Sequence, residues 1–251
     1  MSEHFKKIML PLHVLGCLVI PFFTTEYVVH FLLGWVAMSG FGIAVGMHRY
    51  FCHNSFKTYK PVHYILGWLA CLGSQGSPIF WNAGHVHHHT ESDNDKDVHS
   101  PKHGYWNAYW GWIITLDPRK VPMRYSRRLI ADPYQKWLHL NYYKVVWCSV
   151  LLFSILNILV SGDLYATLYG MILPMMWSTH QEPITNIFGH GFGYRNFDNV
   201  KDNSTNNRLL GLLTFGQCLH NNHHARPNAY YYGTNYTEVD PGGALAWLIK
   251  K

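Results

Sequence analysis

The segment LLTFGQCLHNNHHARP, from Leu212 to Pro227, carries the pattern around which the rest of the chain is organised. It contains His220, His223 and His224, and in a helix this i, i+3, i+4 spacing places three imidazoles on one face. Three nitrogen donors on one face indicate a metal site, although short histidine runs also occur as solvated surface. Partners elsewhere in the chain decide between the two interpretations.

Histidines recur in three other segments, HRYFCH, GHVHHHT and TNIFGHGFG. With the first segment they supply nine candidate metal ligands: His48, His53, His85, His88, His89, His190, His220, His223 and His224. Nine imidazoles are too many for one ion. Divided between two ions they supply four or five nitrogens each and leave open positions for a reactive ligand.

The ligand type restricts the metal without identifying it. Calcium or magnesium sites would use carboxylates and copper(I) sites would use sulfur, whereas imidazole suits zinc, copper, iron or nickel. The pair His48 and His53 is a special case, because residues five apart are about 140° apart around a regular helix. They can meet at one site only if the helix ends between them; otherwise they serve different ions. We expect His48 at the cytosolic end of a membrane span, with the chain turning after it.

Ligand imidazoles usually donate their second N–H to a carboxylate, an amide or a carbonyl. The sequence offers five candidates close to the histidine groups: Asp93, Asp95, Asp97, Gln217 and Asn222. Asn186 lies four residues before His190 and would share its helix face. Six other histidines are expected in the core or at interfaces, because they lie within spans that lead away from the cluster or have no companions: His13, His30, His63, His103, His139 and His180. His87 lies inside the GHVHHHT group but off its i, i+3, i+4 face.

The composition points to a membrane protein. Of 251 residues, 48% are apolar and only 14% are charged, against roughly a quarter charged in soluble domains. We predict a single all-α integral membrane domain, residues 1–251, with four spans in two hairpins and a histidine-rich cap that binds two metals. The spans are 8–23, 27–47, 145–160 and 164–179, the cap is 48–141 and 181–251, and the segments 61–80 and 104–112 are expected along the interface.

The charges predict the orientation. In this arrangement all 20 Lys and Arg residues lie on one side, and the two turns on the other side carry only Glu26 and Asp163. By the positive-inside rule, both termini and every histidine group face the cytosol. The net charge of +6 therefore requires no nucleic acid as a partner. It would also attract anionic headgroups, acyl-CoA phosphates or an acidic redox partner.

The motifs HRYFCH, GHVHHH, NIFGH and HNNHHARP, in this order and separated by paired spans, resemble those of the membrane-bound fatty acid desaturases. DKDVHSP and LLTFGQC are similar to the Δ9-type acyl-CoA or acyl-lipid branch. The resemblance covers roughly residues 48–227. It implies two iron ions held by the nine histidines, with Asn186 reaching the metal through water. It further implies O2-dependent formation of a cis double bond, at Δ9, in a saturated acyl chain.

The resemblance also implies partners. Electrons would come from a separate donor, cytochrome b5 or ferredoxin with its reductase. The sequence departs from the family pattern at four positions that are not predicted ligands: Gly84, where Asp is usual; Val86, where Arg is common; Tyr109, at a site often held by His; and Gln217, which replaces a frequent Glu. These departures concern donor docking, headgroup contacts and the surroundings of the ligands.

An acyl chain must reach the metals from the bilayer, so a tunnel among the spans is expected. Residues at steps of four before His48 would line it, or would simply pack helix against helix: Leu32, Val36, Gly40 and Ala44. Two other functions remain open, a related di-iron membrane hydroxylase or oxidase and a membrane protein that binds metal without redox chemistry. A transporter would place its polar ligands near mid-span, whereas these histidines lie at span ends.

Overall fold

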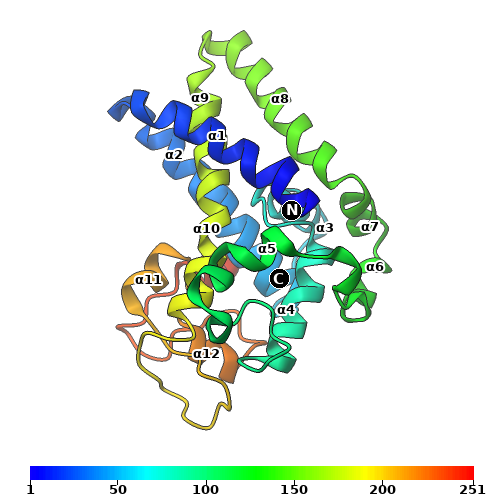
Figure 1. Cartoon of the computed structure of the whole chain (residues 1–251). Helices are drawn as coiled ribbons and strands as arrows, with labels where there is room; N and C mark the ends of the chain where they lie inside the picture. The colour runs from blue at the N-terminus through cyan, green and yellow to red at the C-terminus, as the bar shows by residue number, and fades with distance from the viewer.

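The computed structural model describes residues 1–251 and is built of helices, which confirms the all-α prediction. Strand pairing is limited to the isolated bridges of Asn206 with Tyr194 and Leu219. Long helices extend from one end of the molecule, and short helices and loops, α11 and α12 among them, gather at the other (Figure 1).

Three helical stretches are long and apolar enough to cross a membrane. They are Phe5–Phe22, comprising η1 (Phe5–Met9), α1 (Leu10–Val19) and η2 (Ile20–Phe22); Thr25–Cys52, comprising η3 (Thr25–Tyr27), α2 (Val28–Trp35) and η4 (Val36–Cys52); and α8 (Tyr142–Ser161). On α8 most apolar side chains from Leu151 to Val160 are exposed, as expected of a surface that faces lipid.

The fourth predicted span, 164–179, lies in a continuous helical stretch made of α9 (Tyr165–Thr167), η9 (Leu168–Ile172) and α10 (Leu173–Phe188). It is not among the three stretches with the length and hydropathy of a span. The stretch packs closely on α2, because a Cβ at Gly34 would lie 2.0 Å from the Gly170 carbonyl oxygen. The C-terminal part of α10 continues to the histidine-bearing end of the molecule (Figure 1).

The segment 61–80 contains most of helix α3 (Lys60–Leu72), a turn and the first residues of helix α4 (Pro78–Glu91). Helix α3 packs along η4, where a Cβ at Gly42 would lie 2.5 Å from the Leu69 carbonyl oxygen. Helix α4 then begins at Ser77, whose hydroxyl accepts a hydrogen bond from the Phe80 N–H. This N-cap fixes the start of the helix that carries the GHVHHHT motif.

Short helices make up much of the remaining chain. Between α4 and α8 lie η5 (Pro101–His103), η6 (Asn107–Gly111), α5 (Trp112–Thr115), η7 (Pro118–Lys120), η8 (Met123–Ser126), α6 (Arg127–Ile130) and α7 (Pro133–Leu140). After α10 follow α11 (Arg208–Leu213), α12 (His220–Ala225) and α13 (Pro241–Ile249).

A buried ion pair ties the C-terminal segment to η4. Both oxygens of Asp240 accept from Arg49 Nη2, at 2.8 and 3.0 Å, and neither side chain is exposed. Arg49 also donates to the carbonyls of Ala44 and Tyr230 and lies over the Tyr232 ring. Since Arg49 follows His48 directly, these contacts hold the histidine end of η4 against the segment that leads into α13.

Candidate metal centre

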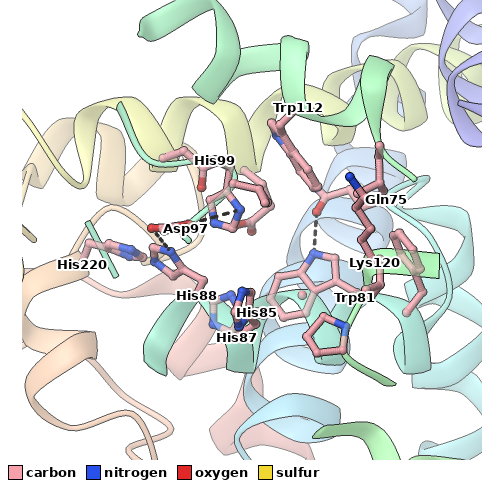
Figure 2. Close-up of a pocket in the computed structure, with 18 residues that line it drawn as sticks. Gln75, Trp81, His85, His87, His88, Asp97, His99, Trp112, Lys120 and His220 are labelled. Carbon is pink, nitrogen blue, oxygen red and sulfur yellow. Dashed lines mark hydrogen bonds and ion pairs between the residues drawn. The ribbon is translucent and has the colours of Figure 1, made fainter. Parts of the chain in front are cut away.

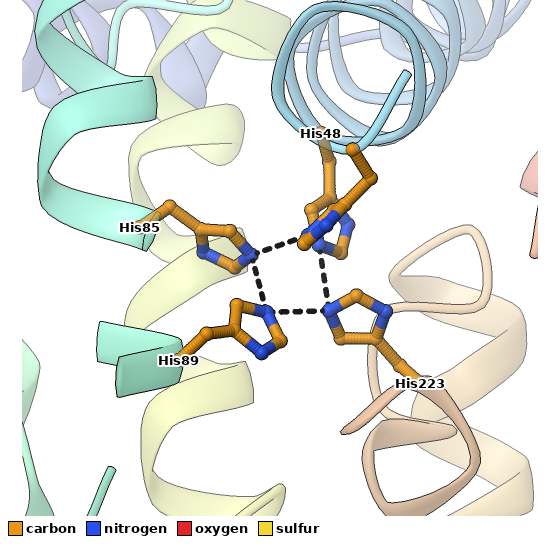
Figure 3. A group of neighbouring side chains, drawn as sticks. His48, His85, His89 and His223 are labelled. Carbon is orange, nitrogen blue, oxygen red and sulfur yellow. Dashed lines mark hydrogen bonds between the residues drawn. The ribbon is translucent and has the colours of Figure 1, made fainter. Parts of the chain in front are cut away.

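Five histidines from three elements converge on one point. His48 and His53 come from the end of η4, His85 and His89 from α4, and His223 from α12. One ligand atom from each lies within 4.8 Å of all the others. The Nε2 atoms of His48 and His223 are 3.0 Å apart, and those of His89 and His223 are 2.9 Å apart. Figure 3 shows four of these rings turned toward one another.

A π-helix allows His48 and His53 to share this group. The His53 N–H donates to the His48 carbonyl oxygen at 3.0 Å, an i to i+5 hydrogen bond, and η4 is π-helical throughout. The wider turn brings residues five apart close to the same face. The expectation that these histidines meet only if the helix ends between them, or else serve different ions, was therefore wrong. The chain turns after His53 instead.

The other four histidines form a second group: His88 from α4, His190 from the end of α10, and His220 and His224 from α12. The Nε2 atoms of His220 and His224 are 3.0 Å apart. Because α4 and α12 each contribute to both groups, the i, i+3, i+4 spacing places neighbouring histidines of one helix at two adjacent sites. The structure thus brings all nine predicted residues together, as five and four.

Every Nδ1 atom of the four-histidine group meets an oxygen acceptor. His88 meets Asp97 and His190 meets Asp93, both at 2.9 Å. The remaining two contacts are those of His224 with Asp202 and of His220 with the main-chain carbonyl of Gln217. Carboxylates and carbonyls can only accept, so each of these imidazoles carries its proton on Nδ1.

Each of the four Nε2 atoms consequently presents a lone pair, and these lone pairs face one another. Without a cation such an arrangement is repulsive, and His190 Nε2 is buried with no hydrogen-bond partner. An ion in the centre would satisfy all four nitrogens, and the acceptors on Nδ1 are the partners that metal-bound imidazoles usually have. The donor set therefore fits a transition metal of the kind that imidazole prefers.

The five-histidine group has different supports. His48 Nδ1 lies 2.6 Å from Gln217 Oε1, and the Trp81 indole stacks on the His85 ring at 4.4 Å between centroids. The Tyr232 hydroxyl lies 3.5 Å from the same His48 nitrogen. Gln217 thus serves a ligand of each group, His48 through its side chain and His220 through its carbonyl.

Three of the predicted supporting residues contact ligand histidines, namely Asp93, Asp97 and Gln217. Asp95 is exposed and pairs with Lys102, and Asn222 bonds to Asn196, Asn206, Glu238 and the Tyr232 carbonyl instead. Asn186 is buried and donates to the Ala108 carbonyl at 3.3 Å.

Sequence reasoning missed Asp202 and His99. The His99 Nδ1 lies 3.8 Å from Asp97, and the motif DKDVHSP, which holds both residues, could have drawn attention to that pair. Asp202 had no local signal, since it lies 22 positions before His224.

The electrostatics keep most ligands neutral. Burial lowers the pKa values of His85, His89, His220, His223 and His224 well below the ordinary value, and neighbouring imidazoles lower them further. Neutral imidazole is the form that binds metal.

The ligand His88 and the neighbouring carboxyl group of Glu182 have raised pKa values instead. Burial acts to lower the pKa of His88 as well, but Asp97 outweighs it and the pKa is raised. Burial raises the pKa of Glu182, on α10, to about 7.

A cavity of about 120 Å³ opens onto both histidine groups. It reaches His85 of the first group and His88 and His220 of the second, and its apolar wall is formed by Phe80, Trp81, Trp112, Leu116, Val121 and Pro122 (Figure 2). The Trp81 indole N–H donates to Gln75 Oε1 at 3.1 Å, which fixes the indole beside His85. A smaller cavity shares Gln75, Trp81, Trp112 and Glu182 with the first.

The four residues predicted to line a tunnel lie outside both of these cavities. Leu32 is 44% exposed, Ala44 is fully buried, and a Cβ at Gly40 would meet Phe215 and Leu245. A tunnel along this face of α2 and η4 stays a prediction.

Gly84 is one of the four positions at which the sequence departs from the family pattern. It lines the larger cavity, and a Cβ added there would have nothing within 4 Å. Val86 is half-buried on α4. Tyr109 lines the smaller cavity, and its hydroxyl is 2.7 Å from His180 Nδ1. His180 in turn contacts His13, with 3.1 Å between their Nε2 atoms.

Comparison with known proteins agrees with the motifs. The model of the family described as fatty acid desaturase matches residues 26–236. The chain belongs to the fatty acid desaturase family. It is therefore an oxidoreductase of that family, with membrane-length helices and a histidine centre, and the predicted resemblance is confirmed.

Individual relatives differ in the reaction and in the acyl carrier. This chain is 34% identical over 218 residues to the sn-1 stearoyl-lipid 9-desaturase of Anabaena variabilis, and the match covers 86% of this chain and 76% of the relative. It is 32% identical over 240 residues to the hex-5-enoyl-[acyl-carrier protein] acetylenase of Moorena producens, covering 88% and 73%. It is 30% identical over 242 residues to the icosanoyl-CoA 5-desaturase of Limnanthes douglasii, covering 96% and 66%.

Proposed function

We propose that this protein is an O2-dependent fatty acyl desaturase that introduces a cis double bond, at the Δ9 position, into a saturated chain carried on CoA or on a lipid. The observation that carries the proposal is the apolar cavity that reaches ligands of both histidine groups. An acyl chain in this cavity would lie beside both metal sites.

Two iron ions are the proposed cofactors, one for each histidine group. When bound, they supply the activation of O2, which takes two hydrogens from the chain with two electrons and two protons and leaves as two waters. The carboxylates of Asp93, Asp97 and Asp202 hold the imidazoles in the protonation state that ligates through Nε2. Trp81, fixed by Gln75, excludes water beside His85 and holds one wall of the cavity in place.

The proposed arrangement in the membrane has four crossings, the fourth formed by 164–179, with both termini and the histidine groups in the cytosol. The one-sided distribution of Lys and Arg supports this orientation. The exposed Lys120 at the cavity would then attract the phosphate of a carrier or headgroup. Electrons would arrive from a separate cytochrome b5 or ferredoxin with its reductase.

The relatives introduce double bonds at position 9 or 5, or form a triple bond, so the position in the product requires a direct test. The chain would be expressed in a desaturase-deficient host with a competent electron donor, and its fatty acids analysed by gas chromatography and mass spectrometry. We expect a new cis-Δ9 monounsaturated species that disappears in His223→Ala. A hydroxylated product would instead establish the related hydroxylase. The absence of any new product from membrane-inserted, iron-loaded protein would contradict both.

A further inference from the structure

A half-buried carboxylate, that of Glu182, lies beside the metal centre. Glu182 lies on α10, four residues before Asn186, and lines both cavities. Its Oε1 atom accepts a hydrogen bond from Gln217 Nε2 at 2.8 Å, and Gln217 is 1% exposed. Glu182 therefore contacts Gln217, the residue whose side-chain amide also contacts His48 Nδ1.

The three residues form a chain in which each hydrogen bond fixes the next. The Oε1 atom of Glu182 accepts from Gln217 Nε2 at 2.8 Å, so the NH2 group of Gln217 faces Glu182. The amide oxygen is then left for His48 Nδ1, 2.6 Å away. Because this oxygen can only accept, the His48 proton must lie on Nδ1, and the Nε2 lone pair points into the five-histidine group, 3.0 Å from His223 Nε2.

Without the Glu182 carboxylate, the Gln217 amide would have no fixed orientation. The oxygen and nitrogen of a glutamine amide have nearly the same shape, so only their partners decide which faces which side. A reversed Gln217 would donate to His48 Nδ1 and favour the proton on Nε2, where it blocks ligation. Tyr232, the other group near this nitrogen at 3.5 Å, has a hydroxyl that can donate or accept and so does not prevent the reversal.

We propose that Glu182 is a positioning residue for the five-histidine site: it holds the Gln217 amide in one orientation and thereby keeps the Nε2 atom of His48 available to the metal. The four-histidine site does not depend on this chain, because its Nδ1 atoms are held by Asp93, Asp97, Asp202 and the Gln217 carbonyl. The inference rests on the proposed function in that it assumes one metal ion in each group.

The test measures metal binding rather than turnover. Purified protein in detergent would be titrated anaerobically with ferrous iron against a chelator, and the bound iron counted after gel filtration. Four proteins are compared: wild type, Glu182→Leu, Glu182→Leu with Gln217→Glu, and Glu26→Leu as a control at the opposite end of the helical stretch Thr25–Cys52. In the double variant, the carboxylate introduced by Gln217→Glu can only accept from His48 Nδ1.

Glu182→Leu is expected to weaken one of the two sites by about 10- to 100-fold, the usual effect of losing a partner of a ligand histidine, and to leave the other site unchanged. The double variant should recover most of this affinity, and Glu26→Leu should behave as wild type. Retention of one tightly bound ion shows that Glu182→Leu is folded. Loss of both sites would show a general structural role, and equal affinity in all proteins or failure of Gln217→Glu to restore binding would overturn the proposal as well.

The two proposals fail in different ways. Wild-type protein that binds two ions without any difference between the variants removes only the role of Glu182. Wild-type protein that binds no iron removes the proposed di-iron function and, with it, the inference that depends on it.

Discussion

His53 donates its main-chain N–H to the carbonyl of His48 at 3.0 Å, and their imidazole centroids lie 4.8 Å apart. This π-helical bond is what allows two histidines of one helix, five positions apart, to enter one site. The five-histidine group thus depends on the geometry of the last turns of η4 as much as on its side chains.

Removing one histidine from either group should release one metal ion. His53→Ala is expected to lower the bound metal from two ions per chain to one, because the first group loses one of its five ligands while the main-chain bond to His48 is kept. Elemental analysis of purified protein measures this. His63→Ala is the matched control, since His63 pairs with Asp132 and Tyr50 outside both groups. Equal loss of metal in both variants would contradict the assignment.

The two aspartates of the loop after α4 should differ in their effect on metal binding. Asp97→Asn removes the carboxylate that accepts from His88 and is expected to weaken the four-histidine site by about 10- to 100-fold. Asp95→Asn is the control, because Asp95 is exposed and pairs only with Lys102. A chelator competition assay separates the two, and similar affinities for both variants would show that Asp97 does not support the ligand.

The close contact of η4 with α3 can be tested through stability. Gly42→Ala would place a methyl group 2.5 Å from the Leu69 carbonyl oxygen, and overpacking of this kind typically costs about 1–3 kcal/mol. Gly84→Ala has open space around its Cβ and should leave the protein as stable or slightly more stable, since Ala favours helix over Gly. Thermal unfolding in detergent compares them. Equal melting temperatures would contradict the packing.

Protonation of Glu238 at low pH should destabilise the segment before α13. Burial acts to raise its pKa, but hydrogen bonds from Tyr194, Thr234 and Asn196 lower it to about 2. A lowered pKa means that the ionised form stabilises the fold above the ordinary value of 4.5 and that this stabilisation is lost as pH falls from 4.5 toward 2.

The protection of residues 227–240 against hydrogen exchange, measured relative to the intrinsic exchange rate at each pH, should therefore fall across this pH range in the wild type. In Glu238→Gln the exchange should already be fast at neutral pH, with a smaller change on acidification. Identical profiles for the two proteins would rule out this role of Glu238.

Much of the centre could be predicted from local spacing. His85, His88 and His89 share one helix face, as do His220, His223 and His224, so the periodicity alone indicated convergent donors. The all-α fold followed from the apolar runs, although 164–179 does not have the hydropathy of the other three spans.

What the sequence could not show depends on longer-range geometry. The i to i+5 bonding of η4 leaves no mark in hydrophobic periodicity, so His48 and His53 could not be placed together. Asp202 reaches His224 only because the chain between α10 and α11 folds back. Glu182 and Gln217 are 35 positions apart, and their hydrogen bond joins α10 to the segment that precedes α12.

We propose that a metal pair held by the nine histidines desaturates an acyl chain in the adjoining cavity. The most direct measurement uses one preparation of purified protein in lipid vesicles with a reduced electron donor, in which iron per chain, O2 consumed and double bonds formed are determined together. We expect two iron ions per chain and one O2 consumed for each cis double bond. Protein with two iron ions and a competent donor that returns only saturated acyl chains would contradict it.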